Sequence, residues 1–506
     1  MSPRERHAPQ HGRHSRPVTT RRVARRTLAI VVLVAVLVGT GVTDRVVARG
    51  VPTPSGAGVP SDALAVTAVS PVSAESTAWY CAGGTAAQGG APGTLVLTNA
   101  GSRPVSGTIT VVPALATGAS PTGPWSGGSA APVTVPADGQ LDVPEGQSGS
   151  SVEAAAVVLD AGGVSVAQAV SSPLGWSMAP CATGAGSHWY FAHGATAQAG
   201  GLLLNLFNPG ATDAAVDVSM VSATAGSLAP AAYQGIDVPP GALVTENIGD
   251  HAADDPALAT QVTSLSGTVV ATELESVGAS ANGGLSITLG TPVPSTQWIF
   301  PQNVDGAGTT VAFRIFNPSS RAAVVSVAIG LSAGEAAEPL TMHVPAQTLS
   351  TLVAENETRI PSGVPYSLTF ASPGTGIVVV RQVTAPPGPP APVPEGGDVV
   401  GVPGPSTHWI VPAVAPPGTG ASSVAVVDLG PAPATVHFTT PSGRPLAGQR
   451  AHRVEPGTPL VLTVAPGAPF GGLPFGVGAN EPVAVELDGQ PAAGPGVVVA
   501  PAFPRT

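Results

Sequence analysis

A serine hydrolase needs its nucleophile on a sharp turn, and one segment of the chain has matching spacing. Gly330-Leu331-Ser332-Ala333-Gly334 fits the G-x-S-x-G nucleophile elbow, which holds the serine between a strand and a helix, within reach of a histidine and an acid. The segment Glu335–Pro339 directly after it is too short for this helix, because a proline closes it. We therefore expect a loop, and a serine hydrolase acting through Ser332 is the least favoured function.

A compact acidic segment suggests a second kind of site. Asp250, His251, Asp254 and Asp255 could supply several of the oxygen ligands that Ca²⁺ prefers. The cluster occurs once and lacks the EF-hand spacing, so we predict a solvated loop and leave calcium binding open. Zinc-ligand spacings, phosphate loops and dinucleotide fingerprints do not occur in the sequence. No catalytic, cofactor-binding or metal-binding residues are therefore predicted.

The two cysteines, Cys81 and Cys181, could form a disulfide. An even pair in an exported domain favours a bridge over free thiols or a metal site. Closing a loop of about 100 residues would contribute on the order of 4 to 5 kcal/mol through the chain entropy of the unfolded state. The alternative is that Cys81 is simply a buried apolar residue, since Phe191, Phe300 and Val411 occupy the matching positions.

Those matching positions are set by tryptophans that return every 109 to 111 residues: Trp79, Trp189, Trp298 and Trp409. At a strand-like repeat position, a tryptophan is expected to be a buried core anchor and not a sugar-binding platform. The remaining two, Trp125 and Trp176, are the candidates for exposed aromatic rings. They are the basis of a glycan-binding alternative.

Further landmarks follow each repeat tryptophan in a fixed order. A turn that begins with asparagine comes about 20 residues later in the first three units, and Asp428-Leu429-Gly430-Pro431 replaces it in the fourth. The flanking segments alternate apolar and polar residues, as Val311, Phe313 and Ile315 do, which predicts half-buried antiparallel strands joined by a short loop. The strands expected to close the units are Val164–Val170, Val269–Glu273, Val378–Val383 and Val483–Leu487.

Composition supports an all-β fold. The chain has 64 Gly and 56 Pro, which interrupt helices, while 43% hydrophobic residues are enough to bury a core in each unit. We predict four tandem β-sandwiches of immunoglobulin or fibronectin type III character after one N-terminal helix. The predicted parts are a basic tail at 1–26, a membrane or signal helix at 27–43, a linker at 44–74, and repeats at 75–182, 183–292, 293–402 with a Pro-rich linker, and 403–506.

The N-terminal segment predicts the compartment. Residues 1–26 hold eight arginines, and Thr27 to Val42 is free of charge. A basic flank before an apolar run keeps the N-terminus in the cytoplasm and directs the rest of the chain to export. We expect an uncleaved signal anchor, and therefore a single-pass plasma membrane protein with an extracytoplasmic C-terminal region. Secretion after signal cleavage is the alternative.

The expected exported part is acidic. Residues 1–50 carry a net charge of +8, so the whole-chain value of −11 leaves −19 for residues 51–506, which contain no lysine. This balance excludes a nucleic-acid partner bound through a basic patch.

The order of Trp-led strand, Asn-Pro-Gly turn, Val-rich return strand, Val-Pro-x-Gly turn and Val-Ala-Thr-Glu strand resembles an uncharacterised family of actinobacterial membrane-anchored exported proteins with tandem β-sandwich repeats of unknown function. The resemblance implies a cell-envelope protein and supplies no catalytic residues. We therefore expect a non-enzymatic scaffold, stalk or interaction module, with repeats in line reaching on the order of 130 Å. The alternative is a cell-wall glycan-binding or envelope-assembly accessory protein, and the partner stays unidentified.

Overall fold

The structure is a computed structural model. The residues it describes are 73–83, 91–116, 123–145, 152–172, 175–196, 201–277, 284–303, 310–332, 337–384, 397–413, 419–446, 449–464, 473–491, 498–500 and 502–505.

The basic tail at 1–26, the segment at 27–43 and the Pro-rich stretch at 385–394 lie outside the described residues. Within the described ranges, no helix has the length and apolar character needed to cross a membrane.

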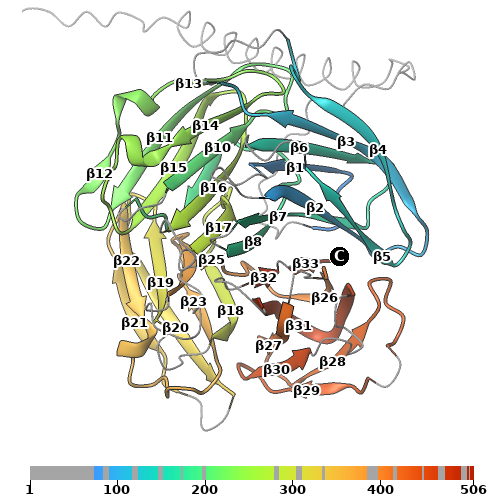
Figure 1. Ribbon diagram of the computed structural model, residues 1–506. Coiled ribbons are helices and arrows are strands. Elements are labelled where there is room, and N and C mark those ends of the chain that lie inside the picture. Colours follow the sequence, from blue (N-terminus) through green and yellow to red (C-terminus); the bar gives the residue numbers. More distant parts are fainter. Residues whose placement is uncertain are drawn as a thin grey trace, which may run out of the picture. The chain divides into compact units, whose positions relative to one another are not determined.

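The described part of the chain is almost entirely β-structure, which confirms the predicted class (Figure 1). Repeats 1, 2 and 3 each form two antiparallel sheets, as in a β-sandwich, while the strands of repeat 4 are connected into one eight-stranded sheet. In repeat 1 the first sheet has the order β1 (Ala78–Ala82), β6 (Glu153–Leu159), β3 (Val105–Pro113), β4 (Ser129–Val135), and the second has the order β5 (Gly139–Pro144), β2 (Ala91–Asn99), β7 (Val164–Ser172), β8 (Gly175–Pro180).

Repeats 2 and 3 keep this order. Repeat 2 comprises β9 (His188–Phe191), β10 (Gly201–Phe207), β11 (Ala214–Ser222), β12 (Gly226–Leu228), β13 (Ile236–Val238), β14 (Leu243–Asn247), β15 (Leu258–Ser266), β16 (Val270–Val277) and β17 (Gly284–Leu289). Repeat 3 comprises β18 (Gln297–Asn303), β19 (Thr310–Asn317), β20 (Ala323–Leu331), β21 (Leu340–Val344), β22 (Thr348–Val353), β23 (Tyr366–Ala371), β24 (Val378–Thr384) and β25 (Gly397–Val400). Three short 3₁₀ turns, η1 (Ala231–Tyr233), η2 (Ile248–Asp250) and η3 (Ala354–Asn356), interrupt them.

Repeat 4 merges two strand positions into one long strand. Its strands are β26 (Ser406–Val411), β27 (Thr419–Asp428), β28 (Ala434–Thr439), β29 (His452–Val454), β30 (Pro459–Val464), β31 (Phe475–Pro491), β32 (Val498–Ala500) and β33 (Phe503–Pro504). The first half of β31 pairs with β26 and β28, and its second half pairs with β27 and β32. One strand therefore links the two sheets of this repeat.

The strand order within a repeat relies on pairs that are distant in sequence. In repeat 1 the first strand pairs with the sixth and the second with the seventh. An immunoglobulin domain instead pairs its second strand with its first and its seventh with its sixth. The observed order places the Trp-bearing strand and the closing strand in different sheets of the same sandwich.

The asparagine turn connects a strand of one sheet to a strand of the other sheet. The two strands on either side of the turn therefore do not pair with each other, and the prediction that they are neighbours is wrong. The Asn317 amide donates to the carbonyls of Arg321 and Val344, at 2.7 and 3.1 Å, and its Oδ1 accepts from the Ser319 N–H at 3.1 Å. The equivalent Asn99 and Asn208 make the same three kinds of bond. The buried amide satisfies backbone groups that no ladder pairs where the chain changes sheets.

The four repeat tryptophans are buried, which confirms that they are core anchors. Their indole N–H groups are satisfied by backbone carbonyls. In repeats 2, 3 and 4 the acceptors are Val269, Ile377 and Val483, at 2.7 to 2.9 Å. Each acceptor lies at or beside the start of the closing strand segment that the sequence predicted, so the tryptophan fixes one sheet against the other.

Neighbouring repeats pack together, and repeat 4 also packs against repeat 1. Buried apolar residues of repeats 1 and 4 belong to one cluster, and two other clusters join repeats 1 and 2 and repeats 2 and 3. Between repeats 4 and 1, the Gln140 side chain accepts from the Ala413 N–H at 2.8 Å and donates to its carbonyl at 3.3 Å. Each repeat therefore contacts the next one, and repeat 4 contacts repeat 1. The prediction that the repeats stand in line is wrong.

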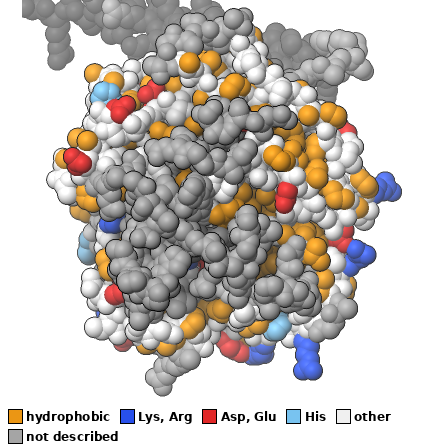
Figure 2. Space-filling model, viewed as in Figure 1, with side chains coloured by type: hydrophobic (Ala, Val, Ile, Leu, Met, Phe, Trp, Pro, Cys, Tyr) orange, Lys and Arg blue, Asp and Glu red, His pale blue; other side chains and the backbone are white. Residues whose placement is uncertain are grey.

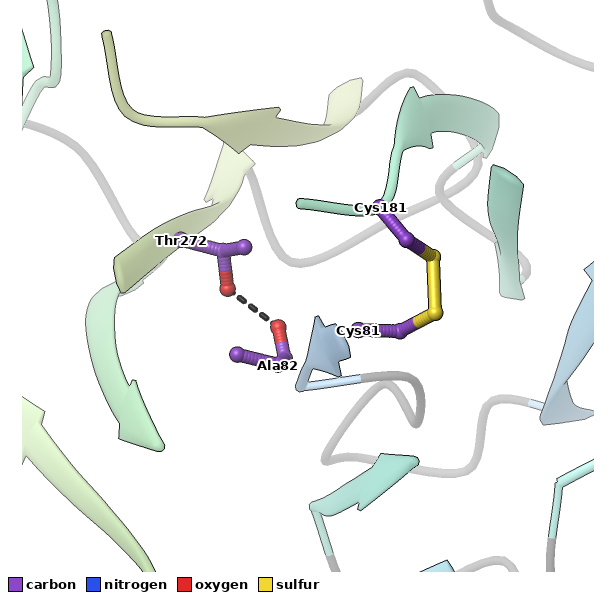
Figure 3. Close-up of a disulfide and its surroundings, with 4 residues drawn as sticks. All are labelled: Cys81, Ala82, Cys181 and Thr272. Atoms are coloured by element: carbon purple, nitrogen blue, oxygen red, sulfur yellow. Dashed lines mark hydrogen bonds between the residues drawn. A yellow bond between two sulfur atoms is a disulfide. The ribbon is translucent and has the colours of Figure 1, made fainter. Parts of the chain in front are cut away.

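The disulfide between Cys81 and Cys181 is present, which confirms that prediction. It ties the first strand of repeat 1 to the residue that follows its last strand, across 100 residues of sequence. Ala82, the residue after Cys81, accepts a hydrogen bond from the Thr272 hydroxyl of repeat 2 (Figure 3). The bridge therefore stands beside the joint between the first two repeats.

Candidate functional site

Buried charged side chains gather where successive repeats meet. The charged residues of the closing strands in repeats 2, 3 and 4 are Glu273 and Glu275 in β16, Arg381 in β24, and Glu481, Glu486 and Asp488 in β31. Burying an ionised group costs several kcal/mol unless it is paired. A hydrophobic core does not require buried charged side chains, so their positions are candidates for a functional site.

The first cluster joins repeats 2 and 3. The His193 Nδ1 lies 2.7 Å from a carboxylate oxygen of Asp398 and 3.6 Å from one of Glu275. His193 follows β9, Glu275 lies on β16, and Asp398 comes from β25 of the next repeat. The imidazole side chain is fully buried, and the two carboxylates are 6% and 8% exposed.

The backbone of Asp398 is held separately from its side chain. Its N–H donates to the Ser286 hydroxyl at 3.1 Å, and that hydroxyl donates to its carbonyl at 3.4 Å. Because Ser286 lies on β17 of repeat 2, this pair of bonds sets β25 against repeat 2 whatever the charge on the carboxylate.

The charges of this cluster depend on one another. Burial alone would lower the pKa of His193, but the Asp398 and Glu275 carboxylates raise it to about 10. Burial and the neighbouring Asp398 raise the pKa of Glu275 to about 7, whereas the imidazolium holds the pKa of Asp398 below its usual range. At neutral pH the arrangement is an imidazolium ion bound to one firmly ionised carboxylate.

A third acid lies beside the cluster. Glu273 and Glu275 are two residues apart on β16, so their side chains share one face. Glu273 is 3% exposed, and its Oε1 accepts no hydrogen bond from the described residues. Burial raises its pKa to about 8, and Glu275, His193 and Asp398 all influence it. The joint thus holds one imidazole and three carboxyl groups.

The second cluster joins repeats 3 and 4 around Arg381. Its guanidinium donates to Glu486 at 2.5 Å and to the Asn303 side chain at 3.0 Å, and lies 3.5 Å from Asp488. It also donates to the Gln302 carbonyl. Arg381 is 2% exposed and Glu486 is 5% exposed, so neither charge can be hydrated if the other is removed. Burial, then the charge of Glu486, raises the pKa of Asp488 well above its usual range.

Repeat 1 contains a buried acid without a cation. Glu145 is fully buried, and neither carboxyl oxygen has a hydrogen-bond partner among the described residues. Burial, followed by the nearby Glu153, raises the pKa of Glu145 to about 8. The carboxyl group is therefore protonated in the folded protein at neutral pH.

Glu145→Gln is expected to flatten the pH dependence of stability. The pKa is 4.5 for a free side chain and about 8 when folded. A raised pKa stabilises the fold fully below the unfolded value, and the stabilisation is lost as pH rises towards 8. The loss is at most about 4 to 5 kcal/mol. Urea unfolding at pH 5 and pH 8 measures it, with the exposed Asp160→Asn as control. Equal pH slopes in wild type and Glu145→Gln would contradict this assignment.

Ser332 directly follows strand β20, and the next element that the structure describes is strand β21. The requirement for glycine at position 330 comes from packing, because a Cβ there would lie 1.6 Å from the Gly457 carbonyl oxygen of repeat 4. Within the described residues the Ser332 hydroxyl has no hydrogen bond to a histidine or an acid, while its N–H donates to the Pro365 carbonyl at 2.9 Å. The glycine serves the packing of two repeats.

The acidic segment of repeat 2 is spread over a 3₁₀ turn and a loop. Asp250 accepts from the Asn247 amide at 2.8 Å, and Asp255 accepts from the Ala257 N–H at 3.0 Å. His251 packs against the Tyr233 ring. Across the described residues, the side chains that come together as possible metal ligands are instead His193, Glu275 and Asp398.

Trp125 and Trp176 are half-buried, which differs from the exposed rings expected. Trp125 packs edge-on against Phe207 of repeat 2, with ring centroids 5.7 Å apart. Trp176 packs against the cluster shared by repeats 1 and 4. Both rings therefore contribute to joints between repeats.

On the described part of the face in Figure 2, acidic and basic side chains are few and form no extended patch of one sign. This agrees with a chain in which 10% of residues are charged.

The buried charged residues at the joints between repeats were not predicted, although the sequence contains a signal for them. A charged residue inside a Val-rich closing strand is unusual, and it recurs in repeats 2, 3 and 4. That recurrence could have indicated buried partners. It could not have identified them, because Asp398 and Glu486 come from the following repeats.

Comparison with protein families gives one match. Residues 160–356 match a family of unknown function, DUF5719. The match confirms the resemblance to an uncharacterised family, and it covers His193 and Glu275 but neither Asp398 nor Arg381. A search of curated proteins finds no match to the chain.

Proposed function

We propose that this chain is a non-enzymatic cell-envelope protein whose four repeats act as an extracytoplasmic interaction scaffold. The observation that carries the proposal is how the repeats are joined. Shared apolar clusters and buried ion pairs make residues 67–506 one compact unit. Such a unit holds the outer surfaces of its repeats in a fixed relation, as a scaffold requires.

Two observations support the compartment. The basic residues 1–26 before the apolar segment 27–43 fit a membrane anchor with a cytoplasmic N-terminus. The Cys81–Cys181 disulfide fits an oxidising compartment. A protein released by signal cleavage would share the second feature, so anchoring is the more specific part of the proposal.

The alternatives have less support. Glycan binding was expected to use Trp125 and Trp176, whose rings are half-buried at joints. Hydrolysis through Ser332 would need a strand-to-helix turn, and among the described residues the element after β20 is strand β21. An envelope-assembly accessory role is compatible with a scaffold, and the partner distinguishes the two.

The test combines topology with binding. An alkaline phosphatase fused after Thr506, which is active only outside the cytoplasm, is expected to be active in cells. Residues 67–506 are expected to scatter X-rays with a radius of gyration of roughly 22 Å. A photocrosslinker at Leu265, which is 63% exposed, is expected to capture the same envelope partner in wild type and Ser332→Ala. An inactive fusion, or fluorophosphonate labelling abolished by Ser332→Ala, would contradict the proposal.

A further inference from the structure

The joint between repeats 2 and 3 has the composition of a metal site. His193, Glu275 and Asp398 each offer one ligand atom, and these atoms all lie within 4.8 Å of one another. The three residues come from three strands or strand ends in two repeats. Their convergence depends on tertiary structure and not on a local acidic loop.

A second observation points to a ligand at this place. The Glu273 carboxyl group faces the same side of β16 as Glu275, is buried, and leaves Oε1 without a hydrogen bond among the described residues. The buried Nε2 of His193 also lacks a partner there. A cluster built only to hold an ion pair would not need a further buried carboxyl group with one oxygen left unsatisfied.

We propose that His193, Glu275 and Asp398 bind a divalent transition-metal ion that clasps repeat 2 to repeat 3. One imidazole nitrogen with carboxylate oxygens is a donor set for Zn²⁺, at distances of about 2.0 to 2.2 Å. Ca²⁺ fits less well, because it binds six to eight oxygen ligands, whereas one of the ligand atoms at this site is an imidazole nitrogen.

The distances are close to those of a loaded site. Two ligands of one tetrahedral zinc ion stand roughly 3.3 Å apart. The 3.6 Å separation between His193 Nδ1 and Glu275 matches this value, and the 2.7 Å contact with Asp398 must open by about 0.6 Å. The ion would replace the proton that His193 shares with Asp398.

The clasp has a structural consequence for the joint. Asp398 is the second residue of β25, directly after the Pro-rich segment of repeat 3. Metal binding would fix its side chain to repeat 2 in addition to the Ser286 contacts, which use only its backbone. Removing the metal would loosen this joint while leaving the hydrogen bonds between Ser286 and the Asp398 backbone in place.

The test uses the full chain in detergent, purified without a histidine tag. His7, His11 and His14 could bind zinc on their own, so every protein carries their replacement by Gln. After chelation and dialysis against Zn²⁺ at pH 7.5, one zinc per chain is expected by mass spectrometry. Asp398→Asn and His193→Gln are expected to weaken binding by at least about 100-fold, as loss of a direct ligand should exceed the 10- to 100-fold cost of an outer-shell change.

A matched control lies on the same strand. His188→Gln removes an exposed histidine of β9 and is expected to leave zinc binding unchanged. X-ray absorption of the His7, His11 and His14 background protein is expected to show one imidazole and only oxygen ligands besides, which tests the site even if a variant fails to fold. The proposal is overturned if that protein retains less than about a tenth of a zinc per chain, or if Asp398→Asn binds zinc as tightly.

Discussion

Arg381→Met is expected to lower the free energy of unfolding by about 3 to 5 kcal/mol, because it removes one partner of a buried ion pair. The Glu486 carboxyl group, which is 5% exposed, would lose the 2.5 Å contact that compensates its burial. The Asn303 side chain and the Gln302 carbonyl would lose their donor as well. Methionine fills much of the same volume, so the loss reports charge and hydrogen bonding more than a cavity.

Urea unfolding followed by tryptophan fluorescence measures the effect. Arg453→Met is the matched control, because its ion pair with Glu455 is exposed on both sides, and such pairs contribute about 0 to 1 kcal/mol. Adding Glu486→Gln to Arg381→Met is expected to recover part of the stability, since the carboxylate that lost its closest cation is then removed. A loss below about 1 kcal/mol in Arg381→Met would show that the joint stays hydrated.

The variant Cys81→Ala/Cys181→Ala is expected to lose about 4 to 5 kcal/mol, because the bridge closes 100 residues and removes chain entropy from the unfolded state. The effect should reach beyond repeat 1. Ala82, next to Cys81, accepts the Thr272 hydrogen bond from repeat 2, and Cys81 belongs to the apolar cluster shared with repeat 4. Loosening the first strand would weaken both joints.

Chemical denaturation of the wild type with and without a reductant provides the comparison. The oxidised double variant and the reduced wild type should unfold at similar denaturant concentrations, well below the oxidised wild type. If reductant shifts the double variant as well, the agent acts elsewhere. If it leaves the wild type unchanged, the bridge contributes little to stability.

Much of the fold could be read from local patterns. The alternation of Val311, Phe313 and Ile315 gives buried positions in β19, and the tryptophan interval gives the number of sandwiches. The cysteine pair was predictable because only two cysteines exist and both belong to one repeat. Each of these signals concerns a side chain and its own strand or its own repeat.

Pairing partners could not be read in the same way. Alternation says that one face of a strand is buried, and it does not say which strand lies beside it. The segments on either side of Asn317 therefore suggested neighbours, whereas β19 and β20 lie in different sheets. The buried charges were hidden for a related reason, since the partner of Arg381 is 105 residues away in the next repeat.

The fourth repeat shows how chemistry can replace a motif. Its Asp428 stands where the other repeats have asparagine. The carboxylate accepts from the N–H groups of Gly430 and Ala434, at 2.7 and 2.9 Å. It cannot donate as the amides do, yet the chain still changes sheets at this point. Accepting backbone N–H groups is the part of the role that both side chains share.

The strand order has a consequence for how quickly the protein reaches this structure. The first strand of a repeat pairs with the sixth, and the second pairs with the seventh. Most of a repeat must therefore be synthesised before its sheets can form. Topologies dominated by distant pairs fold slowly, in milliseconds to seconds, and leave apolar strands open in the meantime. A chain cut inside any repeat should therefore be a target for proteolysis or aggregation, whereas delays between repeats should do less harm.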